Sequence, residues 1–297
     1  RWLTDKATEG RVRLGELREG LGRLQFIAGP LEFLRPFLGP LYAWSAAGPK
    51  YAQPRLPTLI VLILKFLAAE LKEVRMSPCE KRASHRGEAF RIDAKAEGDC
   101  VVIGGWRTLE SDKAAEAPWF SIALTRATAP WAFERGEPFR TIASLELMAT
   151  LVGLMILMPE TEARSESAAT LTFSAGTDNQ GNSYLLDRMM TTKYPLVVVL
   201  MELAHQMRLR RLVLRARWLP RLQNEESDAL TNFDYRHFSK DRRIPVDLDK
   251  IGFKVLPMLF EAGEAYIKEL EDARKFEKAR STLAREEGKE QANKKRR

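Results

Sequence analysis

Cysteine is scarce in this sequence, with two residues in 297. Cys79 and Cys100 stand in unlike surroundings and lack the spacing of metal ligands, so neither a disulfide framework nor a zinc site is indicated. A reducing compartment is therefore expected, which makes the protein intracellular, either cytoplasmic or nuclear.

Long hydrophobic runs are scarce as well. The most apolar stretch, residues 56–71, falls short of the roughly 18 to 20 residues of a membrane span and contains Lys65. It predicts a buried helix, and no membrane partner is expected. The first residues resemble a charged helix rather than a signal peptide. Because the chain begins with Arg1 instead of methionine, we expect it to be a segment of a longer protein.

What the sequence has is enough apolar residues for a core and an excess of basic ones. Hydrophobic residues make up 45% of the chain, which excludes a disordered protein and allows one large or two smaller domains. The formal net charge of +8 favours a polyanionic partner such as nucleic acid, although it is equally compatible with a role in solubility alone.

The composition and the spacing of hydrophobic residues change along the chain and indicate four parts. Residues 1–75 show helical spacing of leucines, and residues 76–88 are polar and basic, as in a linker. Residues 89–235 alternate short strand-like and longer helix-like segments, and residues 236–297 contain an apolar helical stretch followed by a charged, basic end ("KKRR"). We expect a helical segment, a linker, an α/β domain and a helical basic tail.

The α/β part has a definite order of elements. "AFRIDA", "CVVIGGW" and "PWFSIAL" are typical of three antiparallel strands, and "PFRTIASLELMATLVGLMIL" of a long helix. "TLTFSA" predicts a fourth strand, followed by two helices, a fifth strand ("RRLVLRARWLP") and a short helix ("NEESDALTN"). The order β-β-β-α-β-α-α-β-α predicts a mixed five-stranded sheet flanked by helices.

Four carboxylates fall at informative places in this layout: Asp93, Glu146, Asp178 and Asp228. Asp93 lies in a strand that should be central, where an unpaired carboxylate costs several kcal/mol. If the first and fourth strands are neighbours, Asp93 and Asp178 lie side by side, and the first long helix can place Glu146 over them. A cluster of acids repels itself unless cations bind, and oxygen ligands suit Mg²⁺ or Mn²⁺.

This part of the chain resembles the ribonuclease H domain of retroelement reverse transcriptases, over about residues 88–235. The four acids match the order Asp, Glu, Asp, Asp of that family on its first strand, first helix, fourth strand and last helix. "DNQ" at 178–180 resembles the aspartate followed two residues later by a substrate-contacting glutamine, and "WLPRLQNEESDALTN" resembles the stretch in which an asparagine precedes the last aspartate by four. Upstream, "LGRLQFIAGPLEFLRPFLGPLYAW" resembles the helical thumb and connection of retrotransposon enzymes.

The resemblance implies an endonuclease that hydrolyses the RNA strand of RNA–DNA hybrids with two Mg²⁺ or Mn²⁺ ions, in a polyprotein with a polymerase domain upstream. It assigns the four acids as catalytic, metal-binding residues. A basic edge between His205 and Arg221 is expected to hold the hybrid backbone. The expected substrate contacts are Asn179, Gln180, Asn224, Arg215, Arg217 and Arg221.

Other interpretations stay open at this point. Asp178 alone is compatible with a turn or helix cap, and Asn179 with either a cap or a substrate contact. The family's histidine before the last aspartate has no counterpart in "RARWLPRLQNEES", and His205 and His237 flank this stretch at a distance. A non-catalytic hybrid-binding module and an integrase-like enzyme of the same superfamily are the alternatives to a ribonuclease H.

Overall fold

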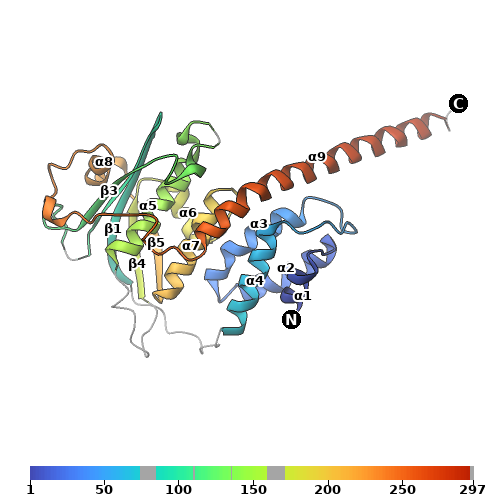
Figure 1. The fold of residues 1–297 in the computed structure, drawn as a ribbon, viewed down its shortest axis with the longest axis horizontal. Helices are drawn as coiled ribbons and strands as arrows, with labels where there is room; N and C mark the ends of the chain where they lie inside the picture. The colour runs from blue at the N-terminus through green and yellow to red at the C-terminus, as the bar shows by residue number, and fades with distance from the viewer. Residues whose placement is uncertain (74–84, 110, 135, 159–170, 295–297) are drawn as a thin grey trace. The chain divides into compact units, whose positions relative to one another are not determined.

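The computed structural model of the chain describes residues 1–73, 85–109, 111–134, 136–158 and 171–294. The chain divides into two compact units, one made of Arg1–Val74 with Glu261–Arg297 and the other of Arg75–Phe260 (Figure 1). The second unit contains the four acids singled out above.

The first unit is helical, as the leucine spacing predicts. Its helices are α1 (Trp2–Glu9), α2 (Leu14–Ile27), the short 3₁₀ helix η1 (Glu32–Leu34), α3 (Arg35–Ser45) and α4 (Thr58–Glu73). The apolar face of α2 is buried against α3, and α1 packs on α4. The C-terminal part of α9 (Leu256–Lys294) belongs to this unit, where the Tyr266 hydroxyl donates a hydrogen bond to the Pro40 carbonyl at 2.9 Å.

The second unit is built on one mixed sheet. In the described part of the chain its strands are β1 (His85–Glu97), β2 (Cys100–Arg107), β3 (Trp119–Leu124), β4 (Leu171–Thr177) and β5 (Leu212–Trp218). Their order in space is β3-β2-β1-β4-β5. The pairs β1–β2 and β2–β3 are antiparallel, whereas β1–β4 and β4–β5 are parallel. The first and fourth strands are thus neighbours, which confirms the condition on which the predicted clustering of acids depends.

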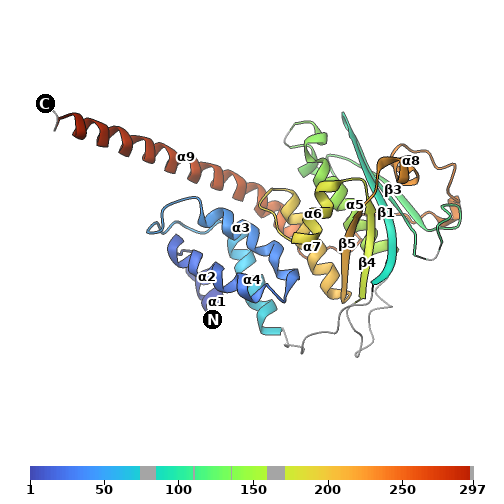
Figure 2. The same ribbon diagram turned by 180° about the vertical axis from the view of Figure 1, so that it is seen from behind.

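Helices cover both faces of this sheet (Figures 1 and 2). The 3₁₀ helices η2 (Pro130–Ala132) and η3 (Pro138–Thr141) lead into α5 (Ile142–Leu157), which packs on β1, β2 and α7 (Leu196–Leu209). Helix α6 (Gln180–Arg188) packs on β5, and α8 (Glu225–Thr231) covers β1 to β3 on the face opposite α5, with η5 (Arg221–Gln223) before it. The mixed five-stranded sheet flanked by helices is confirmed.

The helices pack so closely on the two faces of the sheet that some positions have room only for glycine. A Cβ atom added to Gly153 of α5 would lie 2.9 Å from the Phe90 ring, and one added to Gly104 of β2 would lie 2.9 Å from Leu230 Cβ of α8.

Residues Pro138–Leu157 are long and apolar enough to cross a membrane, but 72% of that window is buried inside the structure. This segment is the core helix of the sheet unit.

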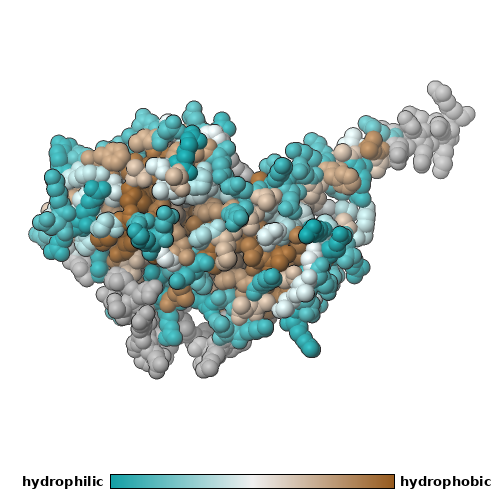
Figure 3. Space-filling model, viewed as in Figure 1, coloured by the Kyte–Doolittle hydropathy of each residue, from teal (hydrophilic) through white to brown (hydrophobic). Residues whose placement is uncertain are grey.

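Hydrophilic residues form much of the rim of the sheet unit in the space-filling view, with hydrophobic residues visible between them (Figure 3). The aromatic residues on the α8 side form a separate buried cluster. Trp106, Trp119 and Phe238 pack there with Leu230, and the ring centroids of Trp119 and Phe238 are 5.4 Å apart. The cluster fixes α8 on the sheet and so determines where Asp228 can lie.

The predicted end of the linker differs from the structure. Residues 76–84 of the expected linker lie outside the described residues, and residues 85–88 belong to β1, where His85 pairs with Thr172 and Glu88 with Ser174. This stretch is polar because the first residues of β1 extend beyond the buried part of the sheet, so its composition does not indicate a strand. The polar stretch "PETEARSESAAT" at residues 159–170, for which the sequence predicts a surface loop, also lies outside the described residues.

The C-terminal part, residues 236–297, is divided between the two units instead of forming one tail. Residues 236–260 belong to the sheet unit, where Phe238 is buried and the Ile244 amide donates to the Trp119 carbonyl at 2.8 Å. The indole of Trp119 in turn donates to the Ser239 carbonyl at 2.7 Å. The predicted boundary at residue 236 rested on charge and did not take the burial of these aromatic side chains into account. In the structure the sheet unit extends to Phe260, within α9.

Candidate metal centre

The acidic centre forms where the ladder between β1 and β4 ends. The last aligned pair is Arg91 with Gly176. Asp93 lies two residues beyond it in β1, Asp178 directly follows the last residue of β4, and Glu146 comes from the second turn of α5. One carboxylate oxygen from each of these three acids lies within 4.8 Å of the others. The structure therefore brings together three of the four predicted acids.

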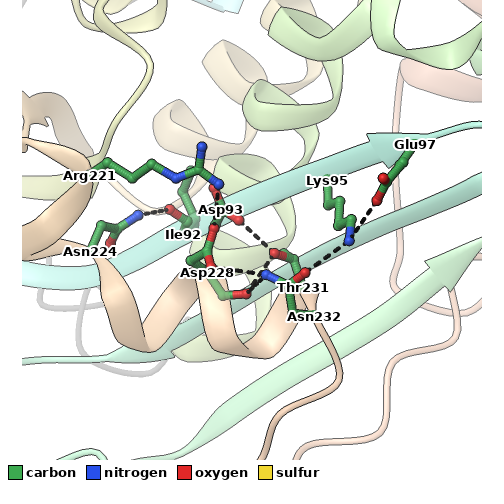
Figure 4. Close-up of polar contacts among 9 residues, drawn as sticks. All are labelled: Ile92, Asp93, Lys95, Glu97, Arg221, Asn224, Asp228, Thr231 and Asn232. Atoms are coloured by element: carbon green, nitrogen blue, oxygen red, sulfur yellow. Dashed lines mark hydrogen bonds and ion pairs between the residues drawn. The ribbon is translucent and has the colours of Figure 1, made fainter.

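Asp93 is almost completely buried, with 6% of its surface exposed. Its Oδ2 accepts a short hydrogen bond, 2.6 Å, from the Thr231 hydroxyl of α8 (Figure 4). Burial raises the pKa of Asp93 to about 6; the Thr231 hydrogen bond opposes this shift, and the charges of Asp178 and Asp228 add to it. A carboxylate in this position is costly without a cation beside it.

Glu146 is buried to a similar degree, with 4% exposed, on a helix whose other residues are mostly apolar. Burial raises its pKa well above the usual value, and the charges of Asp93 and Asp178 raise it further. The Thr177 hydroxyl donates to Glu146 Oε2 at 3.4 Å, and the backbone of Ala94 opposes the shift by hydrogen bonding. The glutamate thus points inward to the end of the sheet instead of lying on a solvated helix surface.

Asp178 is half-buried at the turn between β4 and α6. Burial raises its pKa, and the positive charge of Arg221 opposes that shift. Its backbone carbonyl accepts a hydrogen bond from the Trp218 indole at 3.0 Å, which ties this turn to the end of β5. Asn179 Oδ1 accepts from the Asn182 amide at 3.1 Å, so Asn179 caps α6. Of the two roles considered for Asn179, the structure shows the helix cap. A contact between Asn179 and a substrate stays a prediction.

Asp228 stands apart from the other three acids. Its Oδ1 accepts from Arg221 Nη2 at 2.9 Å, and its Oδ2 accepts from Asn232 Nδ2 at 2.9 Å (Figure 4). Its charge still raises the pKa of Asp93. The charge of the fourth predicted acid therefore acts on the centre. Both of its carboxylate oxygens, however, accept hydrogen bonds from other residues.

Asn224, a predicted substrate contact, lies in a buried position. Sequence reasoning assigned it to substrate binding, but only 1% of the residue is exposed. Its side-chain Nδ2 donates to the Ile92 carbonyl at 3.0 Å, which anchors the start of α8 to β1 next to Asp93 (Figure 4). A buried amide that donates to a strand carbonyl ties the two elements together and so positions the site. We assign Asn224 this positioning role.

The arginines of the expected basic edge fall into different environments. Arg215 and Arg217 lie on β5, where the register aligns Arg217 with Gly176 of β4. Arg217 Nη1 donates to Glu88 Oε2 at 3.4 Å, and its side chain is 59% exposed. Arg210, in contrast, is buried at the end of α7 and bonds to Gln206. The accessible cations beside the centre are thus fewer than the sequence run of arginines indicates.

Several residues that shape this site were missed from the sequence. Arg91, two residues before Asp93 and on the same face of β1, donates through Nε to Glu88 Oε1 at 2.6 Å and through Nη1 to the Gln223 carbonyl at 2.9 Å. The strand period of two places Arg91 on the same face as Asp93 and could have identified it. Thr231 and Trp218 lack such a signal, because their contacts with the site depend on how α8 and β5 pack.

The donor set fits a hard divalent cation. Asp93, Glu146 and Asp178 offer oxygen ligands, two of the three are buried, and each has a raised pKa. Mutual repulsion among buried carboxylates is relieved by a cation such as Mg²⁺ or Mn²⁺ that takes oxygen ligands. The acidic cluster is therefore compatible with divalent metal binding.

Together, the sheet order, the helices on both faces and the acids at the end of β1 and β4 define an α/β protein with a mixed five-stranded sheet and an acidic centre. Among solved structures, the chain is similar to the crystal structure of RNase H1 from the halophilic archaeon Halobacterium salinarum NRC-1. The two are 16% identical, the alignment covers 51% of this chain and 97% of that one, and the TM-score is 0.32. The sequence matches no known family profile and no curated protein.

The raised pKa of Asp93 makes the stability of the metal-free protein depend on pH. The folded pKa of about 6 exceeds the ordinary value, so the folded state binds more protons between about pH 4 and 6, and stability rises as pH falls through 6. In a chelator, we expect the sheet unit to gain about 1–2 kcal/mol between pH 7.5 and 5. Urea unfolding at both pH values measures this. Asp93→Asn should reduce the gain, and an equal gain in that variant would contradict the assignment.

Proposed function

We propose that this protein is a ribonuclease H: a divalent-cation-dependent endonuclease that hydrolyses the RNA strand of RNA–DNA hybrids. The observation that carries the proposal is the meeting of Asp93, Glu146 and Asp178 within 4.8 Å, two of them buried, at the end of adjacent parallel strands. Burial without matching cationic side chains destabilises such a cluster, so its presence is best explained by cation binding.

In this proposal some residues of the chain would bind the metal ions and others would position those ligands. Asp93 and Asp178 would be ligands of the two Mg²⁺ or Mn²⁺ ions that the resemblance implies, with Glu146 and Asp228 as further ligands. Such ions, when bound, activate a water and stabilise the leaving 3′ oxygen of the phosphodiester. Thr231 positions Asp93 through its 2.6 Å hydrogen bond, and the Trp218 indole holds the turn that carries Asp178.

Substrate binding would use exposed groups next to this centre. Gln180 is exposed at the first turn of α6, two residues after Asp178, where a side-chain amide can reach a ribose 2′-hydroxyl. Arg215 and Arg217 on β5 would contact backbone phosphates. Recognition through 2′-hydroxyls on one strand distinguishes a hybrid from double-stranded DNA, which lacks them.

The resemblance to retroelement enzymes supports a retroelement origin, with a polymerase domain upstream in the same polyprotein. Helices α1 to α4 precede the sheet unit in the chain, which is the order of a thumb or connection followed by a ribonuclease H domain. This part of the proposal rests on the sequence resemblance. A primer-extension assay on the longer protein tests it, since a retroelement enzyme would copy RNA as well as degrade it.

A panel of substrates tests the proposed activity. The purified chain would be incubated in Mg²⁺ with an RNA–DNA hybrid, double-stranded RNA, double-stranded DNA and single-stranded RNA of one sequence, each labelled at one 5′ end. We expect internal cuts in the RNA strand of the hybrid and intact DNA. Binding of the hybrid without any cut would instead indicate the non-catalytic module, and joining of DNA ends would indicate an integrase-like enzyme.

A further inference from the structure

Asp228 uses both of its carboxylate oxygens in contacts within the chain. Arg221 donates to one oxygen and Asn232 to the other, and Asn232 Oδ1 accepts from Lys95 Nζ at 2.9 Å (Figure 4). Lys95 in turn pairs with Glu97 at 2.9 Å. The fourth acid is therefore held in a chain of hydrogen bonds and ion pairs that runs from Arg221 through Asn232 and Lys95 to Glu97.

Arg221 is the more exposed partner of its pair with Asp228. It opens the short helix η5 after Pro220, and its side chain is 77% exposed, against 36% for its partner Asp228. Its positive charge also acts on Asp178, whose pKa it lowers against the effect of burial. A single exposed guanidinium thus partly neutralises two acids from the edge of the centre.

We propose that Arg221 is a built-in counter-cation that competes with a divalent cation for Asp228 and is released from Asp228 by a phosphate of the bound nucleic acid. The inference rests on the proposed function, because it deepens the account of the same acidic centre. Arg221 would then be a positioning residue that keeps Asp228 from completing the centre until substrate arrives.

The physical reason is competition for one carboxylate. An exposed ion pair is weak in water and is easily exchanged. A phosphodiester offers the planar guanidinium two non-bridging oxygens as a bidentate partner, with the same charge as the carboxylate that the guanidinium leaves. Removal of the guanidinium removes a positive charge within hydrogen-bonding distance of a metal ligand, and so strengthens the attraction of that ligand for a cation.

Calorimetric titration of Mn²⁺ into the full chain tests the competition without any catalytic readout. We expect Arg221→Gln to bind Mn²⁺ about three- to tenfold more tightly than the native protein, the range set by the loss of one exposed charge interaction. The matched control is Arg126→Gln. Arg126 forms an exposed pair with Asp99 at 3.1 Å, away from the acids, so this variant removes the same charge without the same effect.

A double-mutant cycle with Asp228→Asn locates the effect. Once Asp228 is neutral, Arg221→Gln should change Mn²⁺ affinity no more than Arg126→Gln does. An unchanged Mn²⁺ affinity in Arg221→Gln, or an increase that persists in the double variant, would overturn the competition. Lack of any Mn²⁺ binding by all variants would overturn it as well.

The release by phosphate is measured separately, by fluorescence anisotropy of a labelled RNA–DNA hybrid in EDTA at several salt concentrations. Arg221→Gln should bind the hybrid more weakly and lower the slope of log affinity against log salt by about one, as expected for one lost phosphate contact. An unchanged slope would overturn this half of the inference. Tighter Mn²⁺ binding by Arg221→Gln with no cleavage of the hybrid by native protein would reject the proposed function alone.

Discussion

Replacement of Asp178 by asparagine is expected to abolish hydrolysis of the RNA strand, with a loss of about a thousandfold or more. Asp178 is one of three acids whose oxygens lie within 4.8 Å, and it is the least buried of them, so it is the one best placed to face both a cation and a substrate. Asparagine keeps the shape but loses the negative charge, and with it most of the attraction for a divalent cation.

The measurement is the initial rate of cleavage of a labelled hybrid in Mg²⁺, compared with that of native protein and of Asp99→Asn. Asp99 is an exposed aspartate paired with Arg126, and its substitution removes the same charge away from the acids. Loss of repulsion should leave Asp178→Asn at least as stable as native protein in a chelator. Cleavage by Asp178→Asn at a rate similar to Asp99→Asn would contradict the assignment of the site.

Replacement of Glu202 by alanine is expected to destabilise the sheet unit by about 3–5 kcal/mol. Glu202 lies in α7 and is completely buried, with 0% exposed. Its carboxylate accepts hydrogen bonds from the backbone amides of Val255 at 2.7 Å and Leu256 at 2.8 Å, at the start of α9, and from Gln206 Nε2 at 2.6 Å. A negative charge at a helix N-terminus is favourable, and alanine would leave these buried donors without an acceptor.

Urea denaturation followed by tryptophan fluorescence measures this loss. Glu202→Gln retains one acceptor oxygen and should lose less stability than Glu202→Ala, which keeps the comparison informative if the alanine variant fails to fold. Glu264→Ala, at an exposed position of α9, is the matched control. Equal stability of the Glu202→Ala and Glu264→Ala variants would show that the buried carboxylate contributes nothing to the fold.

The order of strands and helices could be predicted from the sequence because each element carries its own period and its own end signals. The alternating run that contains Asp93 predicts a central strand, and the long apolar helix around Glu146 predicts a crossover. The adjacency of β1 and β4 was only a condition of the predicted clustering, and the structure confirms it. Under that condition, the order of elements predicts that Asp93, Glu146 and Asp178 lie together, as they do in the structure.

The rest of the site depends on packing that local patterns do not encode. Asn224 matched a motif position, yet its side chain is buried against β1, because α8 packs closely over the sheet. Asp228 matched the fourth acid, yet it pairs with Arg221, because η5 brings that arginine over the first turn of α8. Glu202 resembles any glutamate on an apolar helix, and only the return of the chain at residues 254–256 reveals its role.

The central claim is that the acidic centre of this chain hydrolyses the RNA strand of a hybrid with the help of a divalent cation. The most direct test is cleavage of a hybrid with labelled RNA by the purified chain in Mg²⁺ and in EDTA, with products resolved to single nucleotides. We predict internal cuts in the RNA strand that require the cation and leave the DNA intact. Intact RNA from folded protein that binds the hybrid in Mg²⁺, or cuts that persist in EDTA, would contradict the claim.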